Sequence, residues 1–365
     1  MRKYVLLNPK PLPFTFLVVA CLLLFHGCTA IGPQTISRDR FDYAAAISDS
    51  WKKQMLLNMV RIRYGDTPVF LEVASIINQY SVEGEVYLGS TWFPSVSTDS
   101  ANVGASGKYA DRPTITYKPL LGAKFTRSLM TPIPPSALFS LIQAGWPVEF
   151  VMRSCIQSVN GLYNRAGSQM MKRPGDPEFY EFLKLMGRIQ TSGAVDMRVD
   201  ERGEKDTYLM FFRREDVDAS IQKDMERVGE LLGLDRDNNE FELAYGSVPK
   251  NKQEIAVLSR SVFQIIIELA SYIDIPEIHL AEKRATQALT DINKEAYELR
   301  PLICIHANKE KPEDAFVSVK YHEYWFWIDD KDLESKQLFS FLMILFTLSE
   351  TGGFRDSPIV TVPAG

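Results

Sequence analysis

Hydrophobic residues recur with two different spacings in the first half of the chain and predict helices and strands in turn. An apolar face at helical spacing predicts a long helix over residues 37–63, capped by Ser37 and ended at Gly65; its members are Ile47, Trp51, Met55, Met59 and Ile62. β-branched and aromatic runs then predict strands over 69–76, 85–93 and 113–118. The polar, glycine-bearing stretch 95–112 predicts a long loop between strands. A proline-containing connection, 119–135, leads to helices predicted over 136–144 and 147–160.

The second half alternates in the same way and completes an α+β prediction. Helical patterns cover 178–190 and 215–232 and flank a hairpin of strands 194–199 and 207–212. Residues 253–273 are apolar all round, which predicts a central buried helix. A polar surface helix is expected over 281–299, followed by strands, a buried C-terminal helix to Glu350 and a short strand over 358–362. Without a regular strand–helix–strand repeat, we expect a mixed or antiparallel sheet with packed helices. It forms one large domain over 38–365, or two with a subdivision near 165–175.

The most aromatic stretch, YHEYWFWIDD at 321–330, has two interpretations. Together with 315–320 it predicts either one strand or two joined by a bend at Lys320, and large residues on both faces favour a covered strand. Asp329 or Asp330 would then cap the following helix. The alternative is a sugar-stacking platform with Trp325 and Trp327 exposed side by side. The covered strand is favoured because aromatic residues are more often core than platform.

The N-terminus indicates export. Residues 1–10 carry three basic residues and no acid, and 14–25 (FTFLVVACLLLF) form an apolar run. That run has the length of a signal-peptide core and is short of the roughly 20 residues that a membrane-spanning helix needs.

The sequence FHGCT at 25–29 resembles the lipobox of bacterial lipoproteins. The resemblance implies cleavage after Gly27, acylation of Cys28 by diacylglycerol and an amide-linked chain (palmitate-like lipids), and sorting to the outer membrane. Residues 28–37 would be the lipidated tether. Loss of 27 residues removes three positive charges and takes the net charge from −5 to −8, which disfavours nucleic acid as a partner.

Chemistry-bearing residues are sparse in the mature chain. Cys155 and Cys304 could form a disulfide in an oxidising compartment or remain buried thiols. His279, His306 and His322 lack metal-ligand spacing, although His306 and His322 could meet on neighbouring strands beside Glu323. Neither a metal nor a cofactor is predicted. Paired carboxylates of a glycosidase cannot be recognised from sequence.

Three stretches match known motifs only in part, and each lacks residues that its motif requires. Residues 234–246 place Asp235, Asp237 and Asn239 as an EF-hand would, but Glu240 and Gly246 occupy the required glycine and glutamate positions. Ser50-Trp51-Lys52-Lys53 has no K-T-G partner. Residues 102–109 lack the first glycine and the Ser/Thr of a phosphate loop.

Two stretches, SWKKQMLLNMVRIRYGDTPVFLEVASI and YWFWIDDKDLESKQLFSFLMILFTLSE, resemble an uncharacterised family of proteobacterial lipoproteins with no assigned activity. We therefore expect a non-enzymatic, outer-membrane-anchored lipoprotein that faces the periplasm and binds or scaffolds another envelope protein. The alternative is a polysaccharide or peptidoglycan hydrolase or binding module. Loops and proline-rich segments are expected to supply the contacts; the candidates are Ser95, Asn102, Gly104, Gly107, Pro132, Pro134 and Pro135.

Overall fold

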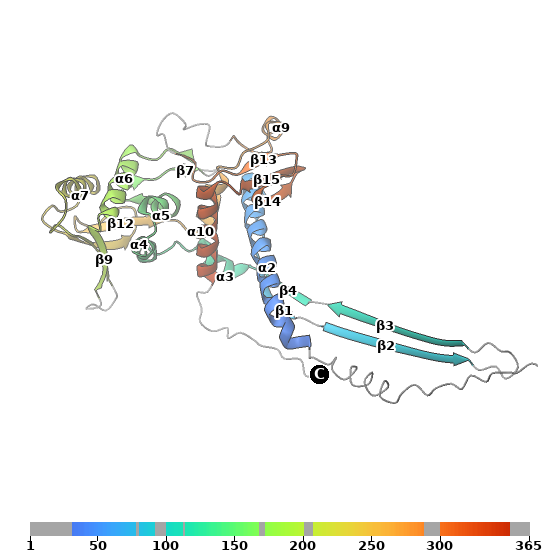
Figure 1. The fold of residues 1–365 in the computed structure, drawn as a ribbon. Coiled ribbons are helices and arrows are strands. Elements are labelled where there is room, and N and C mark those ends of the chain that lie inside the picture. The colour runs from blue at the N-terminus through green and yellow to red at the C-terminus, as the bar shows by residue number, and fades with distance from the viewer. Residues whose placement is uncertain are drawn as a thin grey trace, which may run out of the picture. The chain divides into compact units, whose positions relative to one another are not determined.

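A computed structural model describes residues 31–77, 80–91, 100–111, 114–167, 172–200, 207–287 and 300–350 (Figure 1). The chain divides into two compact units, Met1–Lys52 and Lys53–Gly365, which we describe separately. The fold is α+β, as the sequence pattern predicts. Within the described residues, every helix is too short or too polar to cross a membrane.

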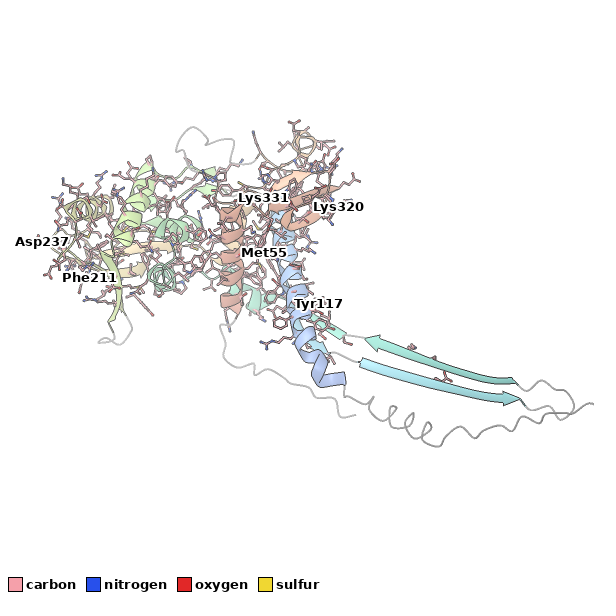
Figure 2. The ribbon with its side chains drawn as sticks, viewed as in Figure 1. Met55, Tyr117, Phe211, Asp237, Lys320 and Lys331 are labelled. Carbon is pink, nitrogen blue, oxygen red and sulfur yellow. The ribbon has the colours of Figure 1, made fainter. Side chains whose placement is uncertain are left out.

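The first helix, α2, runs from Ile31 to Arg63, and its part up to Lys52 forms the described portion of the first unit. Its beginning corrects two predictions, because Ser37 lies inside the helix and residues 31–37 of the expected tether are helical. The C-terminal end is as predicted: Gly65 has a φ of +78°, the left-handed conformation that ends helices. In the second unit, the predicted face contributes Met55, labelled in Figure 2, and Met59 to the core, and both are buried.

A mixed six-stranded sheet organises the second unit, in the order β6-β5-β12-β11-β10-β9. β11 and β12 are parallel, and the other neighbours are antiparallel. The strands are β5 Ile156–Val159, β6 Leu162–Tyr163, β9 Val195–Asp200, β10 Thr207–Phe212, β11 Glu240–Tyr245 and β12 Glu254–Ser259. The associated helices are α4 Pro135–Gln143, α5 Val148–Cys155, α6 Pro177–Thr191 and α7 Ala219–Leu232. The short β7 (Ala166–Gly167) pairs with β8 (Lys172–Arg173).

The central helix predicted over 253–273 is wrong, because this stretch contains a strand and a shorter helix. β12 lies between β11 and β5 and is almost entirely buried, and α8 (Val262–Ala270) follows at once. Ser261 caps α8 through a reciprocal pair of hydrogen bonds with Gln264. An apolar run cannot by itself distinguish a buried strand from a buried helix. The helix predicted over 147–160 likewise ends at Cys155 and continues as β5.

A smaller antiparallel sheet, β13-β15-β14, contains the aromatic stretch. Its strands are β13 His306–Asn308, β14 Ala315–Tyr321 and β15 Tyr324–Asp329. The connection lies at His322 and Glu323, two residues beyond the expected bend at Lys320, and both have positive φ (44° and 67°). α10 (Leu333–Glu350) follows and buries one face in the core. Its cap is Asp332, not Asp329 or Asp330, because the Asp332 carboxylate accepts from the Ser335 amide at 3.1 Å.

The remaining described helices are short: α3 (Gly122–Phe125), the π-helical turn η1 (Thr126–Met130) and α9 (Glu277–Ala281). Of the surface helix predicted over 281–299, residues 282–287 are turn or irregular, and 288–299 lie outside the described residues. The strand predicted over 358–362 lies outside them as well.

Two arginines and one backbone amide surround the buried Glu268 carboxylate of α8 and form an ionic cluster. The Glu268 carboxylate accepts from the Gly167 amide at 2.6 Å and lies 3.8 Å from Arg165 Nε and 3.9 Å from Arg260 Nη2. Arg260 also donates to the carbonyls of Arg153, Ser154 and Arg165. The cluster therefore connects the β5–β7 segment to α8 through charges that have little access to water.

Candidate functional site

Two antiparallel ladders follow each other in the described part of the chain, and we call them together the ribbon. β1 (Leu71–Ile77) pairs with β4 (Thr114–Pro119), and β2 (Tyr80–Thr91) pairs with β3 (Ser100–Asp111). Ile77 pairs with Thr114 in the first ladder, and Tyr80 pairs with Asp111 in the second. Tyr80 lies three residues after Ile77, and Asp111 lies three residues before Thr114. The two ladders therefore share one register.

The ribbon corrects the prediction of a loop over 95–112. Asn102, Gly104 and Gly107 lie inside β3 and are paired with Gly89, Tyr87 and Gly84. Ser95 lies outside the described residues. Glycine is uncommon in strands, so the glycines here favoured a loop. They outweighed a weak alternation of valine and leucine with polar residues, which is the pattern of a strand.

The register of β2 and β3 separates the residues into two rows with different chemistry. One row holds apolar or small residues in four consecutive pairs, and we call it the apolar row: Val82–Tyr109, Gly84–Gly107, Val86–Ala105 and Leu88–Val103. The other, the polar row, contains every charged residue between Ser81 and Ala110 that the structure describes: Glu83, Glu85 and Lys108. In the backbone register Glu83 is the partner of Lys108.

The base of the ribbon is held in the core. Phe70 and Leu120, which flank the β1–β4 ladder, are both buried, and the Leu120 amide donates to the Phe70 carbonyl at 2.9 Å. The Phe70 ring stacks on Phe346 of α10 at a centroid distance of 5.5 Å. Beyond this base the ladder is open, since all six residues of β4 are exposed, including Tyr117 (Figure 2).

Two amides of α2 attach to the strand that enters the ribbon. Asn58 accepts from the Val69 amide at 2.9 Å and donates to its carbonyl at 2.7 Å. One helical turn earlier, Gln54 makes the same two bonds with Leu71, at 2.7 and 3.1 Å. These side chains take the place of a neighbouring strand along three residues and so fix where β1 begins.

The proline segment contributes to packing. Pro132 makes an isolated bridge to Ser261, and the Ile133 amide donates to the Arg260 carbonyl at 3.1 Å. Pro135 is buried as the first residue of α4, whereas Pro134 before it is exposed. Of the three predicted contact prolines, Pro134 is exposed, Pro132 is half-buried and Pro135 is buried.

The aromatic sheet has one buried and one partly exposed face. Phe326 and Ile328 are buried, whereas Trp325 and Trp327 alternate with them and are half-buried. The Trp327 ring lies 5.4 Å from the ring of His306, and Lys311 lies 5.6 Å from the ring of Trp325. Each tryptophan therefore already contacts a polar side chain and keeps part of its surface accessible.

The histidines meet in a different combination from the expected one. His306 pairs with Trp327, away from the turn that carries His322, and contacts Asp274 at 3.3 Å. The ring that lies near His322 is that of His279 in α9, at 6.3 Å. The Tyr64 hydroxyl is hydrogen-bonded to His279 Nδ1 at 2.7 Å. Burial, followed by the charge of Arg284 and by His322, lowers the pKa of His279. The hydrogen bond to Asp274 raises the pKa of His306.

Among the described residues, no group of three or more His, Cys, Asp or Glu side chains has a metal-binding arrangement. Cys155 and Cys304 are free thiols rather than a disulfide. Burial raises the pKa of Cys155 to about 12 and also raises the pKa of Cys304, so both thiols are poorly reactive. The EF-hand-like stretch is a turn leading into β11, and Arg214 donates to its carbonyls at Arg236 and Asn238.

Searches of protein-family models, curated proteins and solved structures found no significant match to this chain.

Proposed function

We propose that this protein is a lipid-anchored, non-enzymatic scaffold of the Gram-negative outer membrane that binds another envelope component through the β1–β4 ribbon. Cys28 would carry the anchor, and the second unit would face the periplasm. Cys28 and the signal sequence lie outside the described residues, so the anchor is inferred from the lipobox-like sequence alone.

The observation that carries the proposal is the ribbon itself. A two-stranded ribbon is marginally stable in water when nothing covers it. β2 and β3 contain four glycines and no proline, and their outer edges are strand edges that other chains can pair with. A chain that keeps such an element, held at its base by Phe70, Leu120 and Asn58, presents strand edges to which a partner can add a strand.

The ribbon can be removed without changing its base. Because Ile77 and Thr114 are paired, residues 78–113 can be replaced by Asn-Gly, which closes antiparallel strands in a two-residue turn. We expect crosslinking in intact envelopes to capture a stoichiometric partner with the full chain and to lose it with the truncated chain.

Two controls accompany this experiment. The truncated chain must keep the unfolding transition of the full chain, since its core lies in the other elements. Cys28→Ser keeps the ribbon and removes the anchor, so loss of its membrane attachment tests the anchor separately. A truncated chain that captures the same partner at the same yield would overturn the proposal.

A second candidate is glycan binding by the half-buried Trp325 and Trp327 on one face of β15. Alternate positions of a strand point to the same face, so the two rings share one side of the sheet. The test is binding to isolated peptidoglycan. If Trp325→Ala loses this binding while the chain with residues 78–113 replaced keeps it, glycan binding is favoured over the scaffold.

A further inference from the structure

We infer that the outer face of the β13-β15-β14 sheet binds a sugar chain that carries carboxylate groups, with sugar rings stacked on Trp325 and Trp327. The inference rests on the second candidate function above, because it names the ligand class and the polar contacts of the same face. It does not depend on the ribbon, so the two sites can be tested separately.

The register of the sheet places polar side chains on both sides of each tryptophan. Residues that are direct partners in neighbouring strands lie on the same face of a sheet. The outer face therefore contains two rows across the three strands, Asn308–Trp325–Lys320 and His306–Trp327–Ser318. The opposite face holds the buried Val317, Val319, Phe326 and Ile328. The outer face is thus an aromatic strip flanked by an amide, an ammonium, an imidazole and a hydroxyl.

Several donors on this face are available to a ligand. In the part of the chain that the structure describes, neither tryptophan has a hydrogen-bond partner for its indole N–H, and both N–H groups reach the surface. The Ser318 hydroxyl and the Asn308 amide nitrogen have no partner there either. A half-buried indole offers an apolar ring face and a polar N–H together. This combination suits a sugar, which presents C–H groups on its ring faces and hydroxyls around its rim.

Two lysines make the Trp325 end of the face positive. Lys320, labelled in Figure 2, is exposed and makes no ion pair with any described residue. Lys311 is also exposed, and its ammonium lies 5.6 Å from the Trp325 ring. Its flexible stem allows the ammonium to turn from the ring to a bound group. Because hydrogen bonds between an ammonium and a carboxylate are stronger than neutral ones, these lysines favour a ligand with a carboxylate at this end.

Acidic residues at the Trp327 end set the direction of the ligand. Asp274 contacts His306 Nδ1 at 3.3 Å, and Asp329 follows Trp327 on the same face of β15. Ionised carboxylates only accept hydrogen bonds, so they bind sugar hydroxyls and repel a carboxylate of the ligand. The acidic group is therefore expected near Trp325 and a neutral sugar ring over Trp327.

A membrane surface is the competing ligand, because tryptophan and lysine also occur together at lipid interfaces. Interfacial binding buries an apolar face about 5–10 Å into the headgroup and acyl boundary. Trp325 and Trp327 are half-buried, and the residues beside them on the outer face are polar. They therefore present ring surface for stacking and lack the protruding apolar face that insertion needs.

The test compares two sugar chains of equal length that differ in charge. Peptide-free peptidoglycan strands carry a carboxylate on alternate rings, whereas chitin oligosaccharides carry none. Binding of each to the full chain is measured by isothermal titration calorimetry for the wild type, Trp325→Ala, Trp327→Ala and Lys320→Gln. Lys223→Gln is the matched control, because Lys223 is an exposed lysine of α7 and lies outside this sheet.

We expect the wild type to bind the acidic strands roughly fivefold more tightly than chitin. Lys320→Gln should weaken binding of the acidic strands roughly threefold and leave chitin binding unchanged. Trp325→Ala should weaken binding of both sugar chains by about tenfold. Because Lys320 is exposed, Lys320→Gln keeps the fold, so the outcome does not depend on the stability of the tryptophan variants.

Three results would overturn the inference. Equal affinity for the two sugar chains would reject the acidic ligand class. Binding of the acidic strands that survives both tryptophan variants would exclude this face as the site. Failure to bind either sugar chain would reject the site, and binding to vesicles that contain phosphatidylglycerol would then assign the face to a membrane surface. None of these results changes capture of a partner by the ribbon, so the scaffold is judged separately.

Discussion

The ionic cluster around Glu268 should contribute strongly to stability, and Glu268→Ala tests this directly. The side chains of Glu268 and Arg260 are 7% and 5% exposed, and Arg165 is 14% exposed. At about 4 Å and an effective dielectric constant of about 20, each arginine is attracted to the carboxylate by about 4 kcal/mol before desolvation is subtracted. Loss of one member of a buried ionic group typically costs about 3–5 kcal/mol, because the remaining charges stay buried without a partner.

We therefore expect Glu268→Ala to lower the free energy of unfolding by about 3–5 kcal/mol. Glu268→Gln should lower it less, by about 2 kcal/mol, because the amide oxygen can still accept from the Gly167 amide while the charge is lost. The measurement is urea unfolding of the mature chain at pH 7, followed by tryptophan fluorescence. The exposed Glu313→Ala is the matched control and should change the free energy by less than about 0.5 kcal/mol.

A loss below about 1 kcal/mol for Glu268→Ala would refute the reasoning, because it would mean that the two arginines reach water when the carboxylate is removed. Equal losses for the alanine and glutamine variants would mean that the lost charge accounts for the whole effect. A loss near zero for Glu268→Gln would instead refute the electrostatic part and assign the effect to the hydrogen bond with Gly167.

Three further predictions concern the helix, the turn and the histidine. Asn58→Ala should destabilise the chain by about 1–3 kcal/mol in the same urea assay because two backbone groups of Val69 lose their partner; a change no larger than that of the less buried Gln54→Ala would contradict this. Glu323→Gly should stabilise by about 1 kcal/mol because the residue has a φ of +67°, and thermal unfolding that shifts downward would exclude it. The lowered pKa of His279 makes its contribution to stability complete above the unfolded value near 6.5 and smaller as the pH falls below it. His279→Gln should therefore flatten the acid side of the stability profile, and an unchanged slope would contradict the prediction.

Local patterns were sufficient for several elements. α6 and α7 lie close to their predicted positions, and Asp218 caps α7 while Gly233, with a φ of +67°, ends it. The hairpin β9–β10 follows the alternation of its residues. In these cases the determining interactions, capping and periodic burial, connect residues only a few positions apart, so the sequence displays them directly.

Other elements depended on partners far away in the chain. The stretch 254–259 is a strand because β5 and β11 lie on either side of it, and nothing in its own apolar pattern distinguishes that outcome from a helix. The same holds for His279, which approaches His322 only because α9 packs beside the β14–β15 turn.

The ribbon shows most clearly the difference between what local sequence determines and what distant partners determine. The sequence by itself determined that residues 95–112 are rich in small and polar residues, which favoured a loop after the strand predicted over 85–93. Tertiary structure decided that the two halves pair, because a ladder register is a relation between strands and not a property of either one. Once Glu83 is paired with Lys108 and Val86 with Ala105, the polar and apolar residues separate into rows, and a segment without an evident pattern becomes an amphipathic ribbon.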